Sequence, residues 1–129
     1  MADQAPRPEA AKVSPEQALR ARLLGMCDGI ITERPARMDA AFTEIAAIES
    51  GRQKEKHPKD AIAGLRSYIA GLAIEMERSL ATLEGMTNEL PALLKSEILA
   101  RMTVAKSKCQ SVRISLEAKK ILEKKDDKK

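Results

Sequence analysis

Residues 62–72 read IAGLRSYIAGL and repeat the tetrapeptide Ile-Ala-Gly-Leu after seven positions. A seven-residue apolar repeat is typical of a helix that packs lengthwise against another helix. The stretch therefore predicts a long helix with an apolar seam that serves packing or partner binding. The seam, extended by one turn, consists of Ile62, Leu65, Ile69, Leu72 and Met76.

Two interpretations of this seam stay open. Isoleucine at one heptad position and leucine at the other favours a two-stranded coiled coil, and hence a homodimer. However, only two heptads are present, and a sustained coiled coil needs three or four. A helix in the core of a bundle produces the same spacing, and we prefer that interpretation.

The composition agrees with a helical protein. The chain has 129 residues, of which 43% are apolar, 33% are charged and only 2% are aromatic. Ala, Leu, Glu, Lys and Arg at these levels are typical of helical proteins, whereas a β-sandwich needs more β-branched and aromatic residues. We expect an all-α fold.

Start and stop signals divide the chain into helices. Residues 14–17, SPEQ, form a capping-box sequence with proline at the first helical position. Pro35 should end or bend the first helix near Arg34, so helices one and two are either separate or one kinked helix. Gly51 is a stop signal, followed by a polar loop. The expected helices cover about residues 15–33, 36–50, 59–86 and 91–123.

The third and fourth expected helices are long and joined by a short turn, which makes them antiparallel neighbours. We expect a three- or four-helix bundle built on this long antiparallel hairpin, forming a single helical domain over residues 14–124. Residues 1–13 should be a disordered tail and residues 125–129 a charged tail.

Two glycines interrupt the long third helix. Gly64 and Gly71 stand seven positions apart, on one side of the predicted helix. Each costs about 1 kcal/mol of helix stability relative to alanine. They indicate either a close approach of another helix or a tolerated weakness.

No motif for catalysis, metal binding or cofactor binding is present. His57 is the single histidine, and neither Cys27 nor Cys109 has a second ligand at metal-binding spacing. Phosphate-binding glycine loops and nucleophile elbows are absent from the sequence. We therefore expect no enzyme, no cofactor and no metal site. We also expect no membrane span and no secretory signal, and a cytoplasmic location.

The net charge of +4 is concentrated at one end of the chain. Residues 101–129 hold 10 basic and 4 acidic side chains. Such a segment can attract nucleic acid or another anionic partner. Acidic residues interrupt it, however, and no aromatic residue is available to stack on bases. The candidate contacts to an anionic partner are Lys106, Lys108, Arg113, Lys119 and Lys120.

By elimination, the sequence predicts a non-enzymatic helical protein-binding module. Within this class we favour a small cytoplasmic adaptor or chaperone that holds an amphipathic helix of a protein partner. Two alternatives stay open. One is a structural subunit of a larger assembly, and the other is a nucleic-acid-associated protein that uses the basic C-terminal helix.

Overall fold

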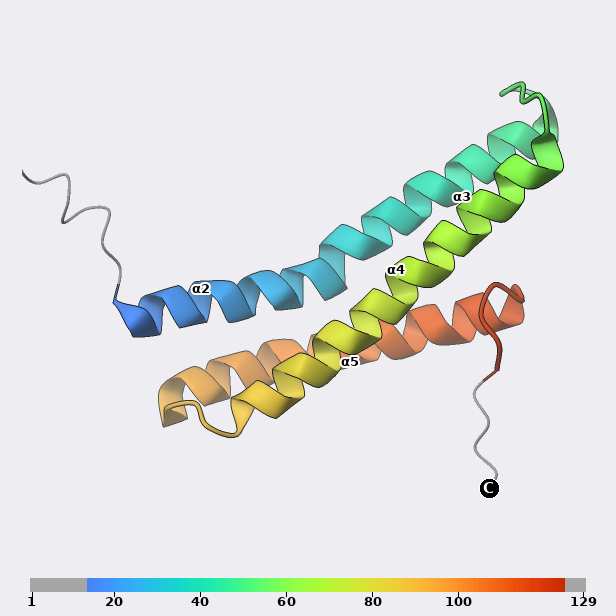
Figure 1. Ribbon diagram of the computed structural model, residues 1–129. Helices are drawn as coiled ribbons and strands as arrows, with labels where there is room; N and C mark the ends of the chain where they lie inside the picture. Colours follow the sequence, from blue (N-terminus) through green and yellow to red (C-terminus); the bar gives the residue numbers. More distant parts are fainter. Residues whose placement is uncertain (1–13, 125–129) are drawn as a thin grey trace, which may run out of the picture.

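The computed structural model describes residues 14–124. Within this range every regular element is helical and no strand occurs, so the predicted all-α fold is confirmed (Figure 1). The expected tails over residues 1–13 and 125–129 lie outside the described residues. The elements are α2 (Pro15–Asp28), η1 (Gly29–Glu33), α3 (Arg34–Ser50), α4 (Pro58–Thr87) and α5 (Ala92–Ala118).

The first helix begins at the expected capping box. The Ser14 hydroxyl accepts a hydrogen bond from the Gln17 backbone N–H at 3.0 Å. In return, the Gln17 side-chain oxygen accepts one from the Ser14 backbone N–H at 3.1 Å. These two bonds satisfy two N–H groups that a helix start otherwise leaves unpaired.

The helix expected to end or bend near Arg34 bends but does not end. The five residues of η1 form a π-helical turn that joins α2 to α3 in one helical run. The Arg34 backbone N–H donates to the Gly29 carbonyl, five residues back. Pro35 has no N–H and its ring crowds the preceding turn, so the wider turn accommodates it without breaking the helix. Figure 1 shows the change of direction between α2 and α3.

The last helix is shorter than predicted. We expected it to run to about residue 123, but α5 ends at Ala118. Lys120 adopts a left-handed conformation, with φ of 62°. The Lys120 N–H donates to the Glu117 carbonyl at 3.0 Å, and the Ile121 N–H donates to the Leu116 carbonyl at 2.8 Å. This pair of bonds is a Schellman motif, which normally places glycine at the left-handed position.

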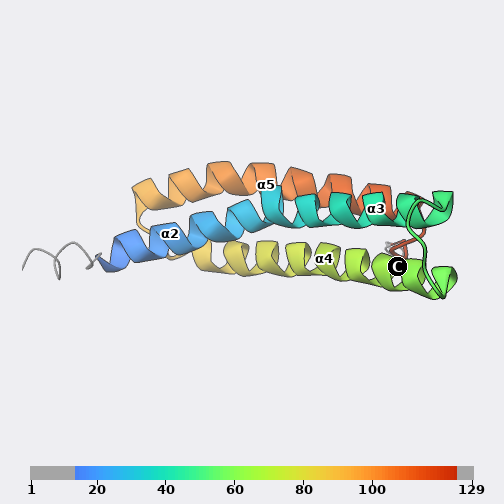
Figure 2. The same ribbon diagram turned by 90° about the horizontal axis from the view of Figure 1, so that it is seen from above.

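Three long helical segments, α2 to α3, α4 and α5, pack against one another around a common core (Figures 1 and 2). α3 packs along α4, α4 packs along α5, and α2 contacts both α5 and α4. Apolar side chains from every segment meet in one core. The largest fully buried members are Leu23, Cys27, Ile30, Ile69, Met76, Leu83, Ile98 and Leu116.

Candidate functional site

The seam predicted from the repeat lies inside the core of this chain. Ile69 and Met76 are fully buried, and Leu72 is 4% exposed. Ile62 and Leu65 are partly buried and pack against the same core. Helices of the same chain therefore cover the seam, and a partner has to be sought on another face.

The two glycines of α4 do not mark a close helix contact. A Cβ atom added at Gly64 or Gly71 would meet no other atom within 4 Å. Both residues are exposed on the outer side of α4. Of the two interpretations drawn from the sequence, the structure agrees with the tolerated weakness.

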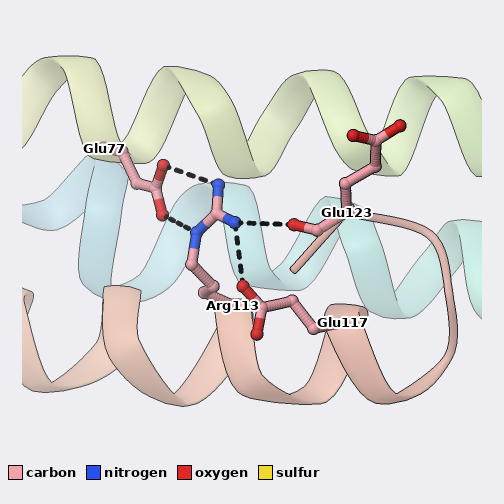
Figure 3. A network of polar contacts seen from close by, with 4 residues as sticks. All are labelled: Glu77, Arg113, Glu117 and Glu123. Carbon is pink, nitrogen blue, oxygen red and sulfur yellow. Dashed lines mark hydrogen bonds and ion pairs between the residues drawn. The ribbon is translucent and has the colours of Figure 1, made fainter. Parts of the chain in front are cut away.

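Arg113, one of the predicted contacts to an anionic partner, is bound within the chain (Figure 3). Its guanidinium donates to both carboxylate oxygens of Glu77, at 2.6 and 3.1 Å. It also donates to the Glu117 carboxylate at 3.0 Å and to the Glu123 carbonyl at 3.3 Å. The hydrogen bonds that Arg113 donates to Glu77 and Glu117 raise its pKa, although its partial burial opposes this. Arg113 thus ties α5 to α4 and to the segment after α5.

The four predicted lysines do not form one basic patch. Lys106 lines a depression between α4 and α5 that also contains Glu77. Lys119 places its ammonium 5.6 Å from the centre of the Phe42 ring, which is a cation–π distance. Lys120 occupies the left-handed turn after α5, and Lys108 lines depressions on a different side of α5 from Lys106.

Three further ion pairs connect neighbouring helices of the described chain. Arg20 of α2 binds Glu97 of α5, with its Nε 2.8 Å from a carboxylate oxygen. The hydrogen bond from Arg20 lowers the pKa of Glu97. Arg101 of α5 forms an ion pair with Asp28 of α2 at 2.6 Å. Arg34 of α3 forms another with Glu75 of α4 at 2.9 Å.

One side of the helical arrangement carries a depression, lined by both polar and apolar side chains, that no helix of the described chain fills. Towards its C-terminal end, α5 diverges from α3 (Figure 1). Two neighbouring depressions of about 470 and 180 Å³ follow α5 there and share Lys108 and Ser111. We call them together the α3–α5 groove. Its lining consists of Ile31, Pro35, Met38, Asp39 and Phe42 on one wall and Thr103, Val104, Ser107, Lys108, Ser111, Val112, Ser115 and Leu116 on the other.

The α5 wall of the groove is made of small, mostly uncharged side chains. Val104 is 51% exposed, although valine is usually buried. The wall runs from Thr103 to Leu116, which at 1.5 Å per residue is roughly 20 Å. This length suits a partner helix of about four turns. The sequence contained a signal for this wall, because Val104, Ser107 and Ser111 recur at helical spacing.

The rest of the described chain offers no reactive centre. Cys27 and Cys109 are both buried, and burial raises the pKa of the Cys27 thiol. Among residues 14–124, no group of three or more His, Cys, Asp or Glu side chains is placed to hold a metal ion. No helix in this range is both long enough and apolar enough to cross a membrane.

Comparisons with models of protein families, with curated protein sequences and with solved structures give no significant match to this chain.

Proposed function

We propose that this protein is a non-enzymatic helical protein-binding module, a small cytoplasmic adaptor or chaperone that holds an amphipathic helix of a protein partner. The antiparallel hairpin of α4 and α5 is its frame, with α2 and α3 packed along it. The partner helix would lie in the α3–α5 groove and complete a four-helix arrangement. An apolar groove that receives an amphipathic helix is a recurring mode of peptide recognition.

The observation that carries this proposal is the apolar part of the lining of the α3–α5 groove, in which Val104 is 51% exposed. Phe42 lines it from α3, and Val104 and Val112 line it from α5. Met38 also lines it, but its side chain is only 4% exposed. Exposed apolar surface that is continuous and flanked by polar groups marks interaction sites more often than scattered single residues do. Because the predicted seam is occupied by the core, we place the partner helix in this groove and not on the seam.

A matched pair of substitutions tests the proposal. The probe is an acetylated 14-residue amphipathic peptide with an Ala/Leu face, whose binding is measured by fluorescence anisotropy. Val104→Asp places a charge in the groove, whereas Ile114→Asp makes a similar change at a side chain that is 68% exposed and outside the groove.

We expect the peptide to bind the wild-type chain and Ile114→Asp equally, and Val104→Asp at least tenfold more weakly. Circular dichroism of both variants checks that the helical content is unchanged. Absence of binding to the wild type, or an equal loss in both variants, would contradict the proposal.

A further inference from the structure

The charges around the α3–α5 groove indicate what kind of helix it accepts, an inference that rests on the proposed function. Between Glu97 and Glu117, α5 carries four basic residues and no acidic residue. Two of these four are neutralised inside the chain, because Arg101 pairs with Asp28 and Arg113 pairs with Glu77. The unneutralised positive charge of this stretch therefore rests on two lysines.

These two lysines lie on different sides of α5. Among the described residues, no carboxylate lies within ion-pairing distance of Lys106 or Lys108. Lys106 faces the depression between α4 and α5, where the carboxylates of Glu77 and Glu84 also lie. Lys108 is partly buried at the junction of the two depressions that form the α3–α5 groove. Lys108 is thus the cation positioned to meet a ligand in the groove.

The charged side chains in the lining of the groove are Lys108 and Asp39. Asp39 lines only the depression that adjoins α3 and makes no ion pair with Lys108 in the described structure. At the same end, the Lys119 ammonium lies over the Phe42 ring. Lys108 lines both depressions whereas Asp39 lines one, so an acidic side chain of a ligand at the junction of the two depressions would lie beside Lys108.

We propose that the α3–α5 groove binds an acidic amphipathic helix, which turns small apolar residues towards Val104 and Val112 and places a flanking Asp or Glu beside Lys108. A second copy of the chain fits this charge pattern poorly. In a dimer with α5 packed against α5, residues 98–116 of the two copies would face each other, and this stretch contains no acidic residue. Like charges across such an interface are unfavourable.

The test compares two peptides with the same Ala/Leu face, one flanked by glutamates and the other by lysines. Each is titrated against the full chain and against Lys108→Glu and Lys106→Glu, two equal charge reversals two residues apart. Lys108→Gln is a second, milder variant that controls for folding. Mass measurement by light scattering across concentration reports any self-association.

We expect the acidic peptide to bind about tenfold more tightly than the basic peptide at low salt, with the difference shrinking as salt is added. Lys108→Glu should weaken the acidic peptide about three- to tenfold, Lys108→Gln by less, and Lys106→Glu by under twofold. Equal binding of the two peptides, or equal losses in both reversal variants, would overturn the inference.

The outcomes separate this inference from the proposed function. If both peptides bind equally and Val104→Asp weakens both, the groove holds helices but does not select acidic ones, so the inference alone fails. If neither peptide binds and the chain has the mass of a dimer that Val104→Asp dissociates, a second copy occupies the groove. That result would overturn both statements.

Discussion

Replacing Gly64 and Gly71 together by alanine is expected to stabilise the protein. Both glycines lie in the interior of α4, in its 30-residue helical run. The added methyl groups would meet no atom within 4 Å, so no neighbour has to move. Alanine also restricts the unfolded chain more than glycine does, which reduces the entropy lost on folding.

The size of the effect follows from these two sites. Each replacement should add about 0.8 to 1 kcal/mol to the free energy of unfolding, so the pair should add about 1.6 to 2 kcal/mol. Because the sites are two turns apart and share no contact partner, their effects should add. Unfolding entropy is about 2.1 cal/mol/K per residue, which for about 110 residues converts each kcal/mol to roughly 4 °C. We therefore expect Tm to rise by about 7 to 9 °C.

Urea unfolding followed by circular dichroism at 222 nm measures the change, and thermal unfolding gives Tm. Gly51→Ala is the control, because Gly51 ends α3 with φ of 84°, where alanine is strained. That variant should lose about 1 kcal/mol. If the Gly64→Ala, Gly71→Ala variant were less stable than the wild type, α4 would have to be packed on this face. That result would show that this face of α4 is not open.

Three further outcomes follow from the contacts described above. Lys120→Gly should raise the free energy of unfolding by about 1 kcal/mol, measured by urea unfolding, because glycine adopts the left-handed turn without strain. Arg113→Met should lower it by about 2 kcal/mol, since partly buried carboxylates lose charged hydrogen bonds. Arg20→Met breaks an exposed ion pair and should lower the free energy of unfolding much less. Equal decreases in the two variants would show that the partial burial of the Arg113 pair does not strengthen it. Cys27 and Cys109 should react slowly with a thiol reagent at pH 8 until denaturant is added. Burial blocks access to both thiols and the raised pKa keeps Cys27 protonated, so fast native labelling would refute this placement.

Local signals in the sequence were sufficient to predict the helices and part of the core. Ser14 and Gln17 form the predicted cap, and Gly51 ends a helix as expected, because both act through bonds to their own neighbours. The apolar repeat also identified buried positions, since Ile69 and Met76 are fully buried. These features depend on spacing along one helix, which a sequence displays directly.

Features that depend on how two helices are placed could not be predicted. Pro35 predicted a break or a bend, and a wider helical turn accommodates it. Whether the helix ends or widens depends on how the segments on both sides pack. Lys120 carries no sequence signal for a left-handed turn, because glycine is the usual residue there. The five basic residues were predicted as contacts to an anionic partner. Lys106 and Lys108 line different depressions, however, and Arg113 forms an ion pair with Glu77.

The groove lining combines Phe42 with Val104, which are far apart in the chain. Their relation depends on the divergence of α3 from α5, a tertiary property that no local pattern encodes. What the sequence did display was the run of small residues on α5, without indicating whether it faced a helix of the chain or open space.

The π-helical turn of η1 also has a consequence for the phase of the helix. It places one additional residue in a single turn, and each residue of an α-helix advances the side-chain direction by about 100°. Compared with an uninterrupted α-helix, the apolar side chains after Glu33 are therefore rotated about the helix axis by about a quarter turn relative to those before Gly29. This offset lets one unbroken segment face α5 along α2 and α4 along α3. Deleting a single residue of η1 would realign the two apolar stripes and turn one of them away from its neighbour, so the length of this turn fixes which helices can meet.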